Sequence, residues 1–121
     1  MKRALSLVFM FLAFALLMVG CSDSPKTVAK KYVQALYYAD VKEADKYSTS
    51  RLYDRNRSKT SFAASINYPD GSLRDDISKR LERELQNIDD ARVEIDGDVA
   101  EIYTDDVLIT LKKVDGDWKV D

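Results

Sequence analysis

The fold is decided by residues 91–121, which read ARVEIDGDVAEIYTDDVLITLKKVDGDWKVD in this chain of 121 residues. Apolar and polar residues alternate there with a period of two, as in strands that bury one face. The alternation is interrupted at Asp96-Gly97 and at Asp115-Gly116, and Asp-Gly pairs favour tight hairpin turns. With a further strand expected over residues 107–114, the stretch predicts an antiparallel meander.

The preceding residues follow a helical period. Ser24 and Pro25 have the character of an N-cap and a first-turn proline, which predicts an amphipathic helix over residues 25–39. Asp40 and Glu43 form a pair similar to a capping box, which predicts a second, shorter helix directly afterwards.

The segment between these helices and the strands is harder to interpret. Residues 48–67 fit either a helix or irregular chain. Tyr68-Pro69-Asp70-Gly71 predicts a turn, and Ser72 is expected to cap the next helix. That helix is predicted by a narrow apolar stripe consisting of Leu73, Ile77, Leu81, Leu85 and Ile88. We therefore expect residues 25–121 to form a single α+β domain, with N-terminal helices packed on a curved antiparallel sheet.

The first residues have the layout of a secretory signal. A basic start, Met1-Lys2-Arg3, precedes an apolar run that ends in LMVGC at residues 17–21. This ending resembles the lipobox of bacterial lipoproteins, in which a small residue precedes an acylated cysteine, and Gly20 and Cys21 fit that pattern. We predict a signal peptide over residues 1–20, cleavage between Gly20 and Cys21, and a lipidated tether over residues 21–24. A transmembrane anchor is the alternative, but the run is shorter than the ~20 apolar residues of a typical span.

A lipobox implies a location in the cell envelope. Two or more acyl chains anchor a protein stably, whereas one chain does so marginally. Ser22 follows the cysteine, where an aspartate would be the usual retention signal. The expected site is the outer membrane facing the periplasm in a Gram-negative cell, and otherwise the outer face of the cytoplasmic membrane.

Composition narrows the classes of function. The chain has no histidine and one cysteine, so histidine-dependent triads and the usual zinc sites are excluded. Without Lys2 and Arg3, the 19 basic residues fall to 17 against 21 acidic ones. Nucleic-acid binding is not expected at that net charge and location, and no metal or cofactor is expected.

Two motifs resemble a known family. Residues 25–47 fit P-x-x-V-A-x-x-Y-V-x-A-L-x-x-A-D-x-x-x-A-D-K-Y, and G-D-x-A-x-I at 97–102 precedes L-x-K-V-D-G-D-W-K-V at 111–120. They resemble small bacterial lipoproteins of unknown function whose domain belongs to the superfamily named for nuclear transport factor two. The resemblance implies a cone in which one long and two shorter helices cover a strongly curved sheet, often around a pocket. Enzymes of that superfamily commonly use aspartate with tyrosine or histidine, and no matching catalytic motif is present here.

The candidate pocket residues are Tyr32, Leu36 and Trp118. A tyrosine hydroxyl on an apolar wall can orient a ligand, although core packing is the favoured explanation of Tyr32. Small domains bury proportionally little surface, so we expect bulky side chains to fill the interior and leave a small or closed cavity. Tyr38, on the polar face of its helix, is expected outside.

Several carboxylates have a structural explanation. Asp40 is explained by capping, and the Asp-Gly-Asp runs at 96–98 and 115–117 by hairpin turns, because neither run supplies the spaced ligands of a calcium loop. Glu84 is expected at the edge of the apolar stripe, paired with Arg80 one turn before it.

The first functional hypothesis is a non-enzymatic, membrane-anchored interaction domain that docks a neighbouring envelope protein through its outer surface. A binder of a small apolar ligand in the cavity is the alternative. An enzyme using aspartate and tyrosine chemistry is the third.

We predict that Cys21→Ala abolishes labelling by a palmitate analogue and releases the protein from membranes, because the acyl chains supply the attachment. Metabolic labelling and membrane fractionation measure both effects. Unchanged membrane retention of the variant would point to a transmembrane segment instead.

Overall fold

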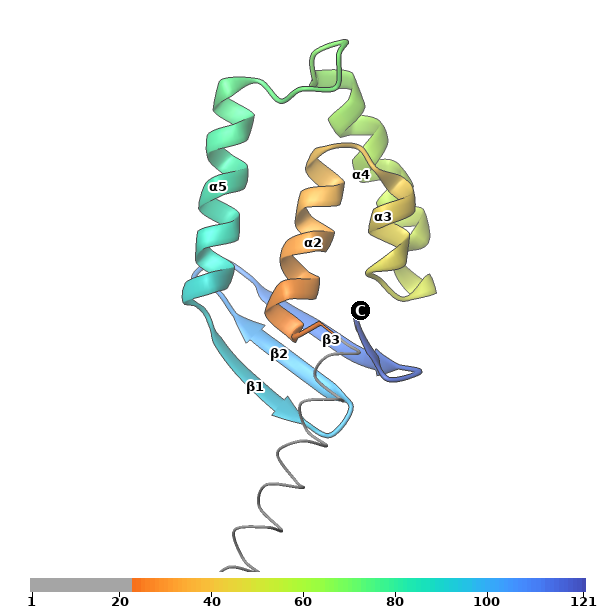
Figure 1. Ribbon diagram of the computed structural model, residues 1–121, viewed down its shortest axis with the longest axis vertical. Helices are drawn as coiled ribbons and strands as arrows, with labels where there is room; N and C mark the ends of the chain where they lie inside the picture. Colours follow the sequence, from red (N-terminus) through yellow and green to blue (C-terminus); the bar gives the residue numbers. More distant parts are fainter. Residues whose placement is uncertain (1–22) are drawn as a thin grey trace, which may run out of the picture.

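A layer of helices stands over one face of an antiparallel sheet in the computed structural model, which describes residues 23–121 (Figure 1). This arrangement confirms the predicted α+β class. The elements in chain order are α2 (Pro25–Tyr37), α3 (Val41–Lys46), the 3-10 turn η1 (Ser50–Leu52), α4 (Tyr53–Ile66), α5 (Asp75–Asp90), β1 (Arg92–Asp96), β2 (Val99–Tyr103), β3 (Leu108–Val114) and β4 (Asp117–Val120). The predicted signal peptide and Cys21 lie outside the described residues.

The first two helices start as predicted. The side chain of Ser24 accepts a hydrogen bond from the Thr27 N–H at 3.3 Å, and the side chain of Asp40 accepts one from the Glu43 N–H at 3.2 Å. Between them, Ala39 has a φ of 59°. The Asp40 N–H donates to the Ala35 carbonyl at 2.9 Å, the bond that closes a Schellman motif. The chain therefore turns sharply, and α3 packs beside α2.

The segment that was ambiguous in the sequence is largely helical, because η1 and α4 together occupy residues 50–66. The turn at residues 68–71 is confirmed, with a φ of 84° at Gly71. The prediction that Ser72 caps the next helix is wrong. Its N–H and its hydroxyl both donate to the Asp70 carboxylate, at 3.0 and 2.7 Å, so its side chain is occupied within the turn. The next helix begins instead at Asp75, with no side-chain cap.

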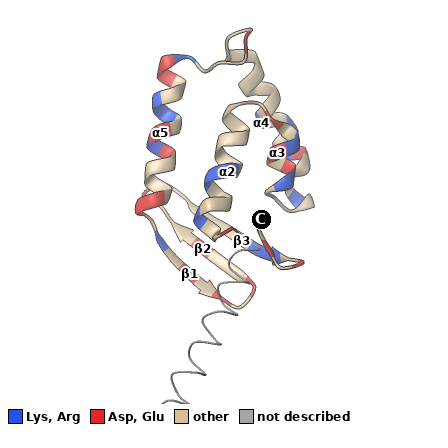
Figure 2. Ribbon diagram, in the orientation of Figure 1, with Lys and Arg blue, Asp and Glu red and all other residues tan. Residues whose placement is uncertain are grey.

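The sheet is a four-stranded meander in the order β1-β2-β3-β4. Both predicted hairpins form, and Asp115 and Gly116 have φ values of 52° and 86°, as a type I′ turn requires. Figure 2 shows acidic residues at both hairpin ends. The inner face carries the buried residues Ala100, Ile102, Leu111, Trp118 and Val120.

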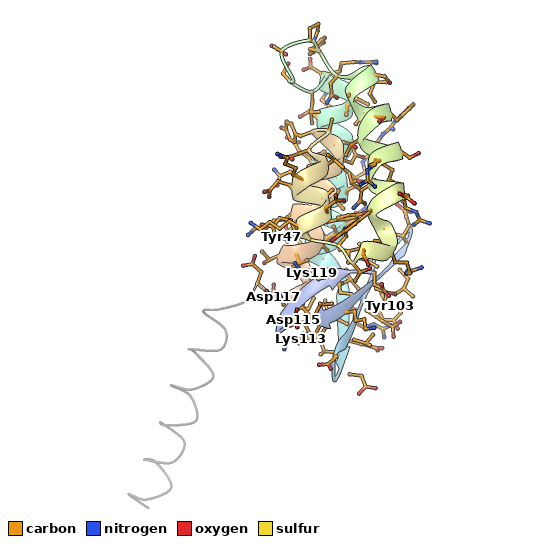
Figure 3. All side chains as sticks on the ribbon, turned by 90° about the vertical axis from the view of Figure 1, so that its right-hand side faces the viewer. Tyr47, Tyr103, Lys113, Asp115, Asp117 and Lys119 are labelled. Atoms are coloured by element: carbon orange, nitrogen blue, oxygen red, sulfur yellow. The ribbon has the colours of Figure 1, made fainter. Side chains whose placement is uncertain are left out.

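The outer edge of β4 is paired with the chain that follows α3. The Val120 N–H donates to the Tyr47 carbonyl and the Thr49 N–H to the Val120 carbonyl, both at 2.8 Å. Figure 3 shows Tyr47 above Lys119 at this edge. Pairing of this kind protects an edge strand from association with another chain.

The core lies between α2 and the sheet, with contributions from the other helices. Its buried residues are Val28, Ala29, Tyr32, Ala35, Ala44, Leu52, Ile88, Ala100, Ile102, Leu111, Trp118 and Val120. All of them lie in the described domain, so a chain of residues 22–121 contains the whole of this core. No helix in the described part of the chain has the length and apolar character needed to cross a membrane.

Trp118 provides a test of this packing. Its side chain is 7% exposed, and the Lys113 ammonium lies 5.2 Å from its ring centroid. We predict that Trp118→Ala lowers the free energy of unfolding by ~3–5 kcal/mol, because the large ring leaves a cavity. Urea denaturation of residues 22–121 measures the change, with the exposed Tyr38→Ala as the control. A loss below ~1 kcal/mol would contradict the buried position.

Candidate functional site

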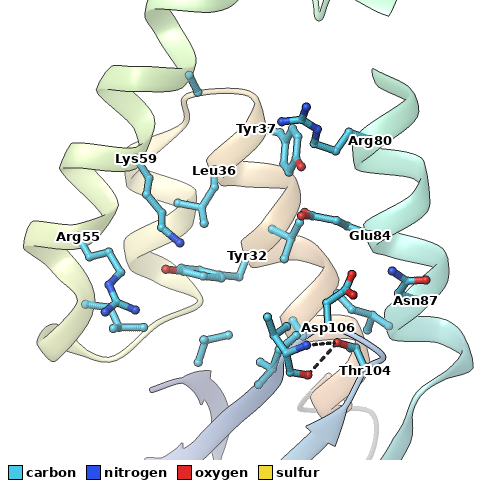
Figure 4. Close-up of a pocket in the computed structure, with 18 of the residues that line it drawn as sticks. Tyr32, Leu36, Tyr37, Arg55, Lys59, Arg80, Glu84, Asn87, Thr104 and Asp106 are labelled. Carbon is cyan, nitrogen blue, oxygen red and sulfur yellow. Dashed lines mark hydrogen bonds between the residues drawn. The ribbon is translucent and has the colours of Figure 1, made fainter. Parts of the chain in front are cut away.

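A cleft of about 720 Å³ opens between the helices and one end of the sheet. Figure 4 shows α2 behind the cleft, α4 and α5 as its opposite walls, and the end of the β2–β3 hairpin below. Its apolar lining includes Val33, Leu36, Leu52, Phe62, Ala63, Ile66, Ile77, Ile88, Val107, Leu108 and Ile109. The volume falls in the range of ligand sites, which is ~300–1,000 Å³.

The expectation of a small or closed cavity is therefore wrong. Helices α4 and α5 both pack against α2, but from opposite sides of it, so their facing side chains do not fill the space between them (Figure 4). Phe62 and Leu108 line the cleft and are still 68% and 52% exposed. The bulky residues are present as predicted, but several of them form walls and do not fill the interior.

The candidate pocket residues are divided between the cleft and the core. Tyr32 and Leu36 both line the cleft. Trp118 does not, because it lies at the start of β4 in the core that α2 covers, whereas Val120 at the end of the same strand reaches the cleft. Tyr38 is 48% exposed and outside the cleft, as predicted.

Tyr32 is held by a buried polar network. Its hydroxyl donates to the Asn56 side-chain oxygen at 2.6 Å, and the Asn56 amide nitrogen donates to Ser48 Oγ at 2.9 Å and to Asp45 Oδ1 at 3.0 Å. The Ser48 hydroxyl donates in turn to the Ala44 carbonyl at 2.8 Å. The ring of Tyr32 thus faces the cleft, while its hydroxyl proton is donated to Asn56 of α4.

Sequence reasoning missed Asn56, which is fully buried. A signal was available, since Asn56, Thr60 and Ala63 follow helical spacing and are the buried residues of α4. Such small and polar residues form no hydrophobic stripe, so an analysis of apolar periodicity overlooks them.

Tyr37 lies higher in the cleft, between Arg80 and Glu84 of α5 (Figure 4). Burial raises the pKa of Tyr37 to about 12, the Glu84 carboxylate adds to the rise, and Arg80 opposes it. The expected Arg80–Glu84 ion pair is wrong, since the ion pairs among residues 23–121 do not include it. Glu84 is exposed and faces the Tyr37 hydroxyl instead.

Charged side chains are distributed unevenly around the apolar lining. Arg55 and Lys59 extend from α4 toward Tyr32, whereas Glu84 and Asp106 lie on the opposite side (Figure 4). Arg80 lies on the same side as Glu84, so the cleft combines an apolar surface with a cationic α4 wall and an opposite side that carries charges of both signs. Within residues 23–121, no three histidine, cysteine, aspartate or glutamate side chains are grouped as metal ligands would be.

Searches of family models, of curated proteins and of solved structures found no match to this chain.

The raised pKa of Tyr37 predicts a loss of stability at alkaline pH. An unfolded tyrosine ionises near pH 10, whereas folded Tyr37 keeps its proton to about pH 12. Between these values the unfolded state binds fewer protons, so the free energy of unfolding falls as pH rises. We predict that Tyr37→Phe makes this fall shallower, as measured by urea denaturation at pH 9 and pH 11.5. Tyr38→Phe is the matched control, and identical pH dependence in wild type and Tyr37→Phe would contradict the assignment.

Proposed function

We propose that this chain is a membrane-anchored envelope lipoprotein whose domain binds a small, largely apolar ligand in the cleft between α4 and α5, without catalysis. The observation that carries the proposal is the cleft itself, with its volume of about 720 Å³ and its predominantly aliphatic and aromatic lining. Ligand sites are typically concave, apolar and supplied with a few polar groups.

The anchor in this proposal rests on the sequence. A basic start, an apolar run and the Gly20-Cys21 junction support lipidation at Cys21. A domain attached in this way would stay beside a membrane.

Membership in the cone-shaped superfamily is part of the same proposal. Its support is the motif at residues 25–47, the Asp-Gly turns of the meander, and helices that cover one face of an antiparallel sheet. A pocket between helices and sheet is what the resemblance implies.

The cleft supports the ligand hypothesis over the hypothesis of a docking surface. A function confined to the outer surface was favoured because a filled interior was expected, and that premise fails. Apolar side chains at the edge of the cleft support a ligand further. Val107 and Phe62 both line the cleft, and they are 57% and 68% exposed to water. A bound apolar molecule would cover part of this surface at ~25 cal/mol per Å².

The test places a larger side chain in the cleft from α2. Val33 is half-buried on α2 and lines the cleft, so Val33→Trp places an indole in the space. Thermal unfolding of residues 22–121 is followed with dodecanoate and with methyl dodecanoate. We expect a saturable rise in Tm for at least one of them, equivalent to ~2.7 kcal/mol at a hundredfold excess over Kd. The rise is expected to disappear in Val33→Trp.

Tyr38→Trp is the matched control, because it adds the same ring to the same helix outside the cleft. It should keep the ligand-dependent rise in Tm. No rise with either compound, or an equal rise in Val33→Trp, would overturn the proposal.

A further inference from the structure

The cationic wall of the cleft consists of two side chains with no ionic partner in the domain. Arg55 and Lys59 lie one turn apart on α4, and both line the cleft. Neither takes part in an ion pair within residues 23–121, whereas Arg57, between them on the same helix, pairs with Asp54 at 3.2 Å. Arg80 of α5 also lines the cleft without an ion pair, but it lies beside Glu84, whereas Arg55 and Lys59 are neighbours on one wall and are both available to a ligand.

On this side of the cleft the hydrogen-bond donors are Arg55 and Lys59, because the hydroxyl of Tyr32 is already used as a donor. Tyr32 already donates its proton to Asn56 at 2.6 Å, so toward the cleft its oxygen can act as an acceptor. Arginine and lysine side chains carry donors and no acceptors. A ligand group that meets this wall must therefore accept hydrogen bonds, and a negative charge makes those bonds stronger.

The opposite side of the cleft carries charges of both signs, because Arg80 lies there beside Glu84. Glu84 and Asp106 line it, and as carboxylates they repel an anion (Figure 4). The charge pattern favours one orientation for an amphiphile, with its head group against α4 and its chain along the apolar lining. Because three acidic residues, Glu84, Asp106 and Asp121, line the cleft, a singly charged head is favoured over a doubly charged one.

We infer that the ligand is a single-chain carboxylate, a fatty acid in chemical class, whose head group binds Arg55 and Lys59 while its chain covers Leu36 and Phe62. A planar carboxylate fits the paired N–H groups of a guanidinium, and the lysine adds a second cation. The inference rests on the proposed function, since it names the ligand class of the same cleft.

The experiment compares three compounds of one chain length: dodecanoate, methyl dodecanoate and dodecylamine. Binding to residues 22–121 is measured by isothermal titration at pH 8. We expect dodecanoate to bind about tenfold more tightly than the other two, as one charge-assisted hydrogen bond allows. Arg55→Gln/Lys59→Gln should remove this preference. Arg57→Gln changes the charge of the same helix away from the cleft, and should keep the preference.

The two proposals fail differently. Equal affinity for dodecanoate and its methyl ester, or tighter binding of dodecylamine, would overturn the anionic ligand while leaving an apolar binding site. Tighter binding of dodecyl phosphate than of dodecanoate would overturn the assignment of a carboxylate. A preference for dodecanoate that survives Arg55→Gln/Lys59→Gln but not Arg57→Gln would overturn the assigned residues. Circular dichroism and the melting temperature of each ligand-free variant separate lost binding from lost folding.

Discussion

The buried amide of Asn56 is the constraint on which the helical layer depends. Its side chain is fully excluded from water, so each of its polar atoms needs a partner inside the domain. Those partners come from Tyr32 on α2, from Asp45 on α3 and from Ser48 after it. Three consecutive parts of the fold are thus held at fixed distances from α4. An apolar residue at this position would fill space without specifying how α4 is oriented.

The orientation of α4 in turn determines the cleft. The same helix that buries Asn56 against Tyr32 of α2 presents Arg55 and Lys59 to the cleft. Helix α5 packs on the other side of α2 through its own apolar stripe, with Ile77, Leu81 and Ile88 buried. Buried residues of both helices, Ala63 on α4 and Ile77 and Ile88 on α5, also border the cleft, so the two helices face each other across it. The space between them is a consequence of this arrangement.

The sequence predicted those elements whose signals are local. Ser24, Asp40 and the Asp-Gly pairs act within a few residues, and the helix starts and hairpins formed where they indicated. The error at Ser72 has the same local character, since a competing partner two residues away takes its side chain. Residues 48–67 could not be assigned because their buried face is small and polar, and its stability depends on contacts across the fold.

The candidate site was predicted less completely, for a geometric reason. Helical periodicity placed Tyr32 and Leu36 inward, and both reach the cleft. Periodicity does not specify whether inward side chains meet one another, because that depends on the angles between helices. Trp118 and Tyr32 both lie in the core, yet one is enclosed and the other borders the cleft. The sequence did not predict that Arg55 and Lys59 line the cleft, for the same reason. Their segment was not assigned to a helix, so the neighbours of these exposed cations could not be inferred.

The charges at the start of α2 bear on how the domain would sit beside a membrane. Under the lipoprotein proposal the tether of residues 21–24 is short, at most ~14 Å when extended, so the start of α2 lies near the headgroups. The lysines of this helix could attract anionic lipid if they were free. Within the described domain, however, Lys30 pairs with Asp89 at 2.7 Å and Lys31 with Asp23 at 2.8 Å, while Lys26 donates to the Asp89 carbonyl at 2.7 Å. The charges of Lys30 and Lys31 are therefore paired with aspartates, and only the charge of Lys26, which contacts a neutral carbonyl, stays uncompensated, so the acyl group of Cys21 would supply most of the attachment.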